Sequence, residues 1–418
     1  MLLPRWHQTL THFRDQPAIF HGEAVLTFAD LAAALATQPL ASAPVLATGS
    51  ALEIVLATLR GWRDGQPVVP VERKDGALPE LDSLPSQVAH VKLTPGNDGR
   101  PRGVWFTAEQ LAADADALVE GMGLARHLPN LATVSLTHSY GYSSIILPLL
   151  LHGIPLQTVE VPFPAVVAAA WKAHPQVVLP AVPSMWRAWH RSGILEQAPI
   201  ALALSAGAPL ALELEQSIWD RHQLKLRNFY GTSEAGGISF DTSSQPRSHA
   251  GDLGTPLPGV QVTLSDDDRF HITSPSVAIG YDHPRPGEKL GNGNFLTPDH
   301  GHLTSGRLIL DARGGEHINV AGRKLGPGRI EGALQATGLT SHVRVFGLPS
   351  SDPERVEEVA ALVPSHTDVA ALRRAVSSAL AGWEIPRHWF TSDQPSDFSL
   401  TRAALRARHH PETGSDPT

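Results

Sequence analysis

The sequence contains no cysteine, which excludes disulfide bonds, thiolate metal sites and a cysteine nucleophile. It also has no apolar run that approaches the roughly 20 residues needed to cross a bilayer, so no membrane partner is expected. The first residues lack the layout of a signal peptide, because Arg5, His7 and His12 interrupt any apolar segment. Together these absences predict a cytoplasmic protein.

Lysine is scarce: the chain has six lysines among its 33 basic residues, and none follows Lys324. The 41 acidic residues give a net charge of -8. Nucleic-acid-binding proteins usually present a basic face, so we expect no nucleic-acid partner. Hydrophobic residues make up 42% and charged residues 18% of the chain, which is typical of a globular protein, and 418 residues are too many for a single ordinary core.

Up to about residue 250, apolar strand-like segments alternate with amphipathic helical segments, as in α/β layering. Residues 44–71 and 131–161 each predict a strand, a helix and a second strand. From about Gly251 the pattern changes to short strands separated by Gly and Pro turns. The sequence therefore predicts an α/β fold with a large, multi-layered N-terminal part.

A small α+β unit is predicted at the C-terminal end. Residues 343–349 and 356–364 have the pattern of strands, and residues 368–382 have that of a helix. A further helix is predicted to begin near Pro327, because proline suits the first turn of a helix. We therefore expect a domain over residues 1–312, a second domain over 313–408 and a disordered tail over 409–418.

The stretch LTPGNDGRPRGVWFT has the outline of a phosphate-binding loop. Gly96 and Gly99 allow backbone N–H groups to form an anion-binding nest, and Arg102 supplies a positive charge. The stretch has no serine or threonine between its glycines, and Asp98 would repel a phosphate unless its side chain turns away. We therefore predict a loop that binds pyrophosphate weakly.

The stretch NFYGTSEAGG follows a strand-like segment and combines two hydroxyl groups with a carboxylate. Thr232 and Ser233 can hydrogen-bond phosphate oxygens, and Glu234 can hold Mg²⁺, which prefers oxygen ligands beside phosphates. Downstream, Asp299 is predicted in a turn, where its carboxylate could bridge two ribose hydroxyls. Arg313 is predicted at the end of a strand, where its guanidinium could bind ribose or phosphate oxygens.

The chain resembles the adenylate-forming superfamily of acyl-CoA synthetases, peptide-synthetase adenylation domains and luciferases. The resemblance extends from Phe13 to Arg408 and depends on seven stretches in the family's order: FADLAAALA, LTPGNDGRPRGV, THSYGYSSIILPLLLHGIPL, SAGAPL, NFYGTSEAGG, GDLGTPLPGVQV and GGEHINVAGRKLGPGRIEGAL. It implies a large N-terminal domain, a mobile C-terminal domain and a site between them.

The resemblance also implies a two-step reaction. A small carboxylic acid reacts with Mg²⁺-bound ATP to give an acyl-adenylate and pyrophosphate. A thiol, from CoA or from the phosphopantetheine arm of an acyl carrier protein, then displaces AMP. The domains would rotate near Arg313 to Gly315. The implied contacts with the adenine are Ala206, Gly207, Ala208 and Tyr230, and Gly231 is a further implied nucleotide contact. Thr232 or Ser233 would contact phosphate, Glu234 would bind Mg²⁺, and Asp299 and Arg313 would hold the ribose.

Two departures from the family pattern concern lysines. The family's loop ends in Pro-Lys-Gly, where this chain has Arg102. The family also ends with a Gly-Lys-x-x-Arg-x-x-Leu element whose lysine reaches the α-phosphate; here Arg402 and Leu405 match it, but Phe398-Ser399 stands where Gly-Lys belongs. Either Arg402 or Arg406 takes over the lysine's role, or adenylation is slow or lost.

His138 bears on the substrate. In amino-acid-activating relatives an aspartate near this position pairs with the substrate's amino group, whereas histidine is found in relatives that activate plain carboxylic acids. The resemblance therefore predicts an aryl or short acyl acid. The alternative, which we favour less, is that His138 is an ordinary packed or solvated histidine. Two function classes remain: a working ligase, which we favour, and a protein of the same fold that binds AMP, an acyl-adenylate or a carrier protein without efficient adenylation.

Overall fold

The computed structural model describes residues 1–72, 78, 81, 84–94, 101–266, 268–312, 318–321, 323–325, 327–352, 355–394, 397–398, 400 and 402–409. The chain forms two compact units, a larger one built from Met1–Thr94 and Arg102–Gly314 and a smaller one that includes Gly315–Thr418. None of the helices in the described part of the chain has the length and apolarity of a transmembrane segment.

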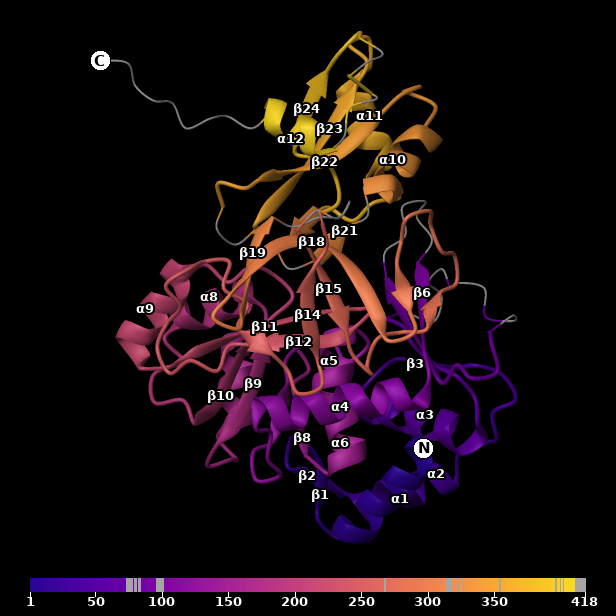
Figure 1. The fold of residues 1–418 in the computed structure, drawn as a ribbon, viewed down its shortest axis with the longest axis vertical. Coiled ribbons are helices and arrows are strands. Elements are labelled where there is room, and N and C mark those ends of the chain that lie inside the picture. Colours follow the sequence, from indigo (N-terminus) through magenta and orange to yellow (C-terminus); the bar gives the residue numbers. More distant parts are fainter. Residues whose placement is uncertain are drawn as a thin grey trace. The chain divides into compact units, whose positions relative to one another are not determined.

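A nine-stranded sheet is the largest element of the larger unit (Figure 1). Its order is β13-β12-β11-β10-β9-β7-β8-β1-β2, and the six strands from β11 to β1 run parallel, with antiparallel strands at the edges. The strands are β1 (Pro17–His21), β2 (Ala24–Thr27), β7 (Asn130–Ala132), β8 (Leu156–Thr158), β9 (Val177–Ala181), β10 (Ile200–Ser205), β11 (Leu226–Thr232), β12 (Gly236–Phe240) and β13 (Thr255–Pro256).

Two five-stranded sheets complete the larger unit. The first has the order β16-β6-β5-β4-β3 and consists of β3 (Val45–Ala47), β4 (Val68–Pro70), β5 (His90–Thr94), β6 (Arg102–Phe106) and β16 (Gly280–Tyr281). The second is antiparallel, with β19 paired to β18, and consists of β14 (Gln261–Leu264), β15 (Arg269–Thr273), β17 (Leu290–Gly291), β18 (Asn294–Thr304) and β19 (Arg307–Ala312). Most strands after residue 250 are short, as the sequence predicts, but β18 has 11 residues.

Several helices of the larger unit begin at residues that the sequence marks. Three of them start with a capping box, in which Thr27, Ser50 or Thr107 and the residue three positions later satisfy each other's backbone donors. The helices are α1 (Leu2–Phe13), α2 (Phe28–Ala36), α3 (Ala51–Asp64), α4 (Ala108–Met122), α5 (Ser139–Gly141), the π-helix η1 (Tyr142–Ile146), α6 (Leu147–His152), α7 (Pro164–Trp171), α8 (Pro183–Ser192) and α9 (Leu212–His222).

The three largest apolar cores among the described residues lie in this unit and hold its layers together. One joins α1, α2 and α3 to α4, η1 and α6. A second joins α4 to β11, β12 and the antiparallel sheet. A third packs α7, α8 and α9 against β9 and β10. Figure 1 shows α8 and α9 together beside these strands. Helix α4 contributes to two of the cores, so its position is fixed from both sides.

The smaller unit is α+β, as the sequence predicts. Its described elements are β20 (Ile318–Val320), β21 (Arg323–Leu325), α10 (Pro327–Ala336), β22 (Arg344–Pro349), β23 (Glu357–Val363), α11 (Val369–Val376), β24 (His388–Thr391) and α12 (Arg402–His409). Two expectations need correction. The helix predicted over 368–382 ends at Val376, and His409, expected in a disordered tail, closes α12 with its ring stacked 4.1 Å from that of Phe390. Residues 410–418 lie outside the described residues.

A buried network of charges ties α9 to β11 and to the chain that follows β12. The Glu215 carboxylate accepts hydrogen bonds from Lys225 Nζ, Arg247 N and Arg247 Nε, and all three side chains are buried. Lys225 Nζ also donates to Asp241 at 2.6 Å. Removing one partner of such a group leaves an uncompensated charge in the interior.

We therefore predict that Glu215→Gln lowers the free energy of unfolding of the larger unit by about 3–5 kcal/mol, the usual cost of breaking a buried ion pair. Urea unfolding measures the change. Glu213→Gln is the matched control, because Glu213 lies in the first turn of the same helix and is exposed. Equal stability of the two variants would contradict the prediction.

Candidate functional site

The carboxyl ends of β10 and β11 bring two of the predicted stretches together. The two strands are parallel neighbours, with Ser205 opposite Asn228, so the residues that follow them meet at one edge of the sheet. Ligands of parallel α/β sheets bind at this edge. Ala206 and Ala208 are buried there, whereas Gly207 is exposed with φ +80, a conformation that favours glycine.

The turn between β11 and β12 carries Thr232, Ser233 and Glu234, all half-buried. A Cβ on Gly231 would lie 2.5 Å from the carbonyl oxygen of Gly236, so only glycine fits at position 231. Thr232 Oγ1 accepts a hydrogen bond from Ala235 N at 3.1 Å, which closes the turn. The turn therefore presents two hydroxyls and a carboxylate from adjacent positions.

Tyr230 and Asp299, which the sequence assigns to the nucleotide, are in direct contact. The Tyr230 hydroxyl donates to Asp299 Oδ2 at 2.7 Å, and both side chains are buried. The bond joins β11 of the nine-stranded sheet to β18 of the antiparallel sheet. A carboxylate has further acceptor capacity after one such bond, so Asp299 can still accept from ribose hydroxyls.

The predicted location of Asp299 in a turn was wrong, because the residue lies within β18. The reason is a local irregularity in that strand. The register of β18 shifts between His300 and Gly301 against β19, and Asp299 N donates to Thr297 Oγ1 rather than to a neighbouring strand. Pro298 has no N–H to donate. The sequence pattern of a turn is thus accommodated as a bulge in a long strand.

Glu234 is connected to Arg102 through Tyr281. The Tyr281 hydroxyl donates to Glu234 Oε1 at 3.1 Å, and the Arg102 guanidinium stacks 3.4 Å from the centre of the Tyr281 ring. Both terminal nitrogens of Arg102 donate to the Glu288 carboxylate. The guanidinium predicted to meet phosphate is therefore already paired with a carboxylate.

The pKa values of this group follow from burial and pairing. Burial raises the pKa of the Tyr281 phenol, and the Glu234 and Glu288 carboxylates raise it further, so the phenol remains a hydrogen-bond donor. Burial would raise the pKa of the Glu288 carboxyl, but hydrogen bonds from Arg102 and from the backbone of Arg285 outweigh it and lower that pKa. Glu288 therefore stays charged and holds Arg102 in place.

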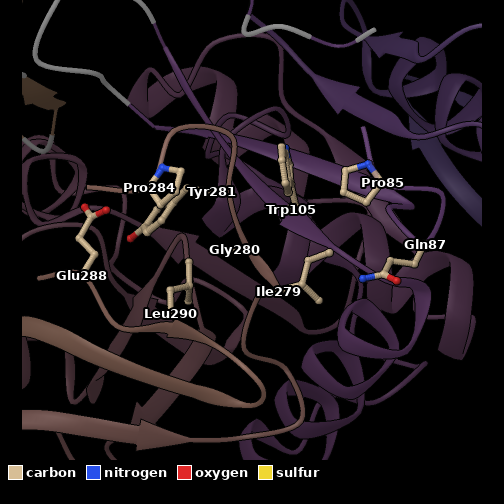
Figure 2. Close-up of a pocket in the computed structure, with 9 residues that line it drawn as sticks. All are labelled: Pro85, Gln87, Trp105, Ile279, Gly280, Tyr281, Pro284, Glu288 and Leu290. Carbon is tan, nitrogen blue, oxygen red and sulfur yellow. The ribbon is translucent and has the colours of Figure 1, made fainter. Parts of the chain in front are cut away.

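A pocket of about 380 Å³ adjoins this group (Figure 2). Tyr281 and Glu288 lie side by side on one of its walls. Trp105, Ile279 and Leu290 make much of the remaining lining apolar. Neither Tyr230 nor Asp299 is among the residues that line it. The pocket thus lies on the Glu288 side of the ion pair and is separate from the hydrogen bond between Tyr230 and Asp299.

His138 precedes α5 and is largely exposed, and its Nε2 lies 2.7 Å from Glu72 Oε1. Its ring is therefore not packed in the core. The Glu72 carboxylate is the partner that fixes its orientation on this surface. An exposed imidazole beside a carboxylate can contact a small ligand, but it can also be an ordinary solvated histidine. The position of His138 therefore does not decide whether this residue contacts the substrate.

In the smaller unit, Arg402 is hydrogen-bonded to protein groups. Arg402 Nε donates to the carbonyl oxygen of Val345 at 2.9 Å, and its terminal nitrogen donates to both oxygens of Glu331. Arg406 pairs with Glu357 at 2.8 Å. Phe398 packs against the apolar cluster around Phe346 and Leu405. Gly96, Gly99, Arg313 and Ser399 lie outside the described residues, so their predicted roles are not addressed.

Sequence reasoning missed Tyr281, Glu288 and Asp114. Arg102 and Glu288 are 186 positions apart, and Gly237 and Asp114 are 123 positions apart, so no local pattern relates them. Lys92 was counted among the few lysines, but its role was not considered. The charged residue within the apolar segment VAHVKL is the one feature of the sequence that could have drawn attention to it.

Comparison with known proteins gives the family of this chain. The AMP-binding enzyme family matches residues 11–281. The 2-succinylbenzoate–CoA ligase of Listeria monocytogenes is 26% identical over 332 residues, which cover 78% of this chain and 71% of the ligase.

Solved structures share the fold at low sequence identity. A double mutant of the o-succinylbenzoate CoA synthetase of Bacillus subtilis superposes with a TM-score of 0.83 at 18% identity, covering 96% of this chain and 97% of the other. The amide bond synthetase of Marinactinospora thermotolerans gives a TM-score of 0.77 at 19% identity, covering 97% and 99%. The α/β fold class and the resemblance stated from the sequence are confirmed. Because the family match spans more than half of its residues, the chain belongs to the AMP-binding enzymes, as an adenylate-forming ligase of the acyl-CoA synthetase type.

Proposed function

We propose that this protein activates a small carboxylic acid with ATP and transfers the acyl group to a thiol. In the first step a carboxylate oxygen of the acid attacks the α-phosphorus of ATP, and the bond to the β-phosphate breaks to release pyrophosphate. In the second step the sulfur of CoA attacks the acyl carbon, and AMP leaves. The phosphopantetheine arm of a carrier protein is the alternative acceptor.

The hydrogen bond between Tyr230 and Asp299, next to the turn of Thr232 to Glu234, is the observation that carries this proposal. It places a buried phenol and a carboxylate at the edge of the sheet where the hydroxyls of the turn also lie. A carboxylate suits a pair of ribose hydroxyls, and hydroxyls suit phosphate oxygens. Residues Ala206 to Ala208 and Gly231 border the same edge and would leave room for a flat adenine.

The residues also fit a magnesium ion that arrives with ATP. Glu234 offers carboxylate oxygens, the ligands that Mg²⁺ prefers, and Tyr281 orients one of them. In the described part of the chain no group of three or more His, Cys, Asp or Glu side chains could hold a metal ion. One protein carboxylate together with substrate phosphates is the usual arrangement for this ion, which would neutralise charge on the phosphates.

An aryl or short acyl acid is the proposed substrate class. His138 occupies the position at which amino-acid-activating relatives carry the aspartate that pairs with the substrate's amino group. Its side chain is exposed and is paired with Glu72. Carboxylate-dependent release of pyrophosphate, measured with benzoates, short fatty acids and amino acids, tests the proposal. Release only with amino acids would contradict the substrate class, and release with none of these acids would favour a binding protein.

A second candidate, an adenylation-impaired protein that binds AMP, an acyl-adenylate or a carrier protein, has one specific observation in its favour. Arg102 is held by Glu288, and Arg402 is held by Glu331 and a backbone carbonyl. Arg102, which stands where the family's loop has a lysine, and Arg402, a candidate for the role of the missing C-terminal lysine, are thus engaged with protein groups. Of the three predictions that follow, the first tests the nucleotide binding that both candidates share, and the last separates the two candidates.

Asp299→Ala should weaken the binding of both AMP and ATP. Each charge-assisted hydrogen bond lost costs about 1.5–3 kcal/mol, or roughly tenfold to a hundredfold in affinity. Isothermal titration calorimetry measures both affinities. Asp116→Ala is the control, because Asp116 is a half-exposed carboxylate that pairs with Arg5 and His152 instead. Unchanged AMP affinity in Asp299→Ala would remove Asp299 from the site.

Arg102→Ala should raise the concentration of ATP needed for activity and leave AMP affinity nearly unchanged. The reason is that Arg102 supports Tyr281, which orients Glu234, and that AMP lacks the β- and γ-phosphates. Tyr281→Phe removes only the hydroxyl and should shift the ATP requirement in the same direction. An effect of Arg102→Ala without any effect of Tyr281→Phe would instead indicate direct phosphate contact by Arg102.

Ser399→Lys should speed carboxylate-dependent pyrophosphate release without much change in AMP affinity. The ammonium would stabilise charge that develops mainly in the transition state of adenylation. Since Phe398 packs against Phe346 and Leu405, the single substitution is preferable to one that also replaces Phe398. A fast wild type with no gain in the variant would show that another group does this work. No release from either protein would support the binding-protein candidate.

A further inference from the structure

Lys92 is a buried lysine in β5 whose side chain is 3% exposed. Its Nζ donates to Ser143 Oγ at 3.1 Å, lies 3.6 Å from Asp114 Oδ2 and lies 4.5 Å from the centre of the Phe106 ring. Burial of an ammonium costs several kcal/mol unless partners compensate for the lost water. The surroundings of Lys92 provide one carboxylate, one hydroxyl and one aromatic face.

Asp114 connects Lys92 to the turn between β11 and β12. Its Oδ2 accepts from Ser143 Oγ at 2.6 Å, and its Oδ1 accepts from Gly237 N at 2.9 Å. A Cβ on Gly236 would overlap the Asp114 carboxylate, so this carboxylate occupies the space of a side chain at position 236. Gly236 and Gly237 begin β12, immediately after Glu234 and Ala235. The Asp114 carboxylate therefore fixes the backbone next to Glu234.

The Lys92 ammonium also interacts electrostatically with Glu234 in this turn. Burial lowers the pKa of the Lys92 ammonium, and attraction to the Asp114 and Glu234 carboxylates opposes that fall. Among the described residues, Lys92 is the cation that forms an ion pair with Asp114, whose hydrogen bonds come from the neutral donors Ser143 Oγ and Gly237 N. Without Lys92, the buried carboxylate would keep two neutral donors and lose its compensating charge.

We propose that Lys92 is a positioning residue for Glu234. Its ammonium compensates the buried charge of Asp114, whose carboxylate holds Gly236 and Gly237 and so fixes the turn that presents Glu234 to the magnesium ion of ATP. This inference depends on the proposed function, because it takes Glu234 as the metal-binding carboxylate. It adds a residue from β5, outside the turn and outside the phosphate loop, to the groups that the reaction needs.

The test compares Lys92→Met with Lys225→Met. Both variants replace a buried, ion-paired lysine by an apolar side chain of similar length. Lys225, however, pairs with Glu215 and Asp241 and precedes the first residue of β11, whereas the turn that carries Glu234 follows the last. Urea unfolding gives the stability that each variant has lost. Calorimetry then gives affinities for AMP without metal and for ATP with magnesium, so that binding is measured without turnover.

Lys92→Met is expected to weaken the binding of magnesium-bound ATP roughly tenfold, as is usual when an outer partner of a metal ligand is lost. Its affinity for AMP should stay within a factor of about two of the wild-type value. Lys225→Met should keep both affinities at a comparable loss of stability. Wild-type affinity for magnesium-bound ATP in Lys92→Met would overturn the inference. So would a parallel loss of AMP affinity, because the effect would then spread beyond Glu234.

If Lys92→Met fails to fold, Ser143→Ala tests the inference in its place. It removes only the hydroxyl that bridges Lys92 and Asp114, and it should weaken the binding of magnesium-bound ATP selectively, by a smaller factor than Lys92→Met. No selective loss in Ser143→Ala would then overturn the inference. A wild-type protein that binds AMP but shows no magnesium-dependent binding of ATP would be a different result, because it would refute the ligase proposal together with the role of Glu234.

Discussion

The close approach of two backbone segments at the turn between β11 and β12 is the constraint on which the site depends. A Cβ at Gly231 would lie 2.5 Å from the carbonyl oxygen of Gly236, and a Cβ at Gly236 would overlap the Asp114 carboxylate. Only hydrogen fits at either position, so the chain turns tightly and immediately re-enters the sheet. Thr232, Ser233 and Glu234 are consequently displayed at the end of a parallel strand, where ligands of such sheets bind.

The supports of this turn come from three different layers. Asp299 reaches Tyr230 from the antiparallel sheet, Tyr281 reaches Glu234 from the edge of the other five-stranded sheet, and Asp114 reaches Gly237 from α4. Helix α4 is itself fixed by two apolar cores. A structural change in any of these layers would therefore alter the position of the turn. The charges of Arg102 and Lys92 serve this scaffold by compensating protein carboxylates, which leaves neutralisation of the phosphates to magnesium and to backbone N–H groups in the proposed reaction.

Local sequence predicted much of the fold because local physics decides it. The capping boxes at Thr27, Ser50 and Thr107 satisfy helix donors within four residues, and the alternation of strands and helices needs only the apolar pattern. Prediction failed where local and distant interactions compete. Asp299 follows a proline, as in many turns, yet pairing with β15 and β19 keeps it in a strand. The helix after Asp368 stops at Val376, where the Ser377 hydroxyl bonds the carbonyl of Arg374.

The sequence by itself determined the family, the α/β class, and the identity of Tyr230, Thr232, Glu234 and Asp299 as candidate site residues, because these depend on the order of short stretches along the chain. The partners of these residues were decided only by tertiary structure. Arg102 meets Glu288, Tyr281 meets Glu234, and Lys92 meets Asp114 across separations that no local pattern encodes. Arg102, which the sequence predicts as a phosphate ligand, and Lys92, for which the sequence predicts no role, are both paired with carboxylates in the fold, since the interior tolerates a charge only beside its compensating partner.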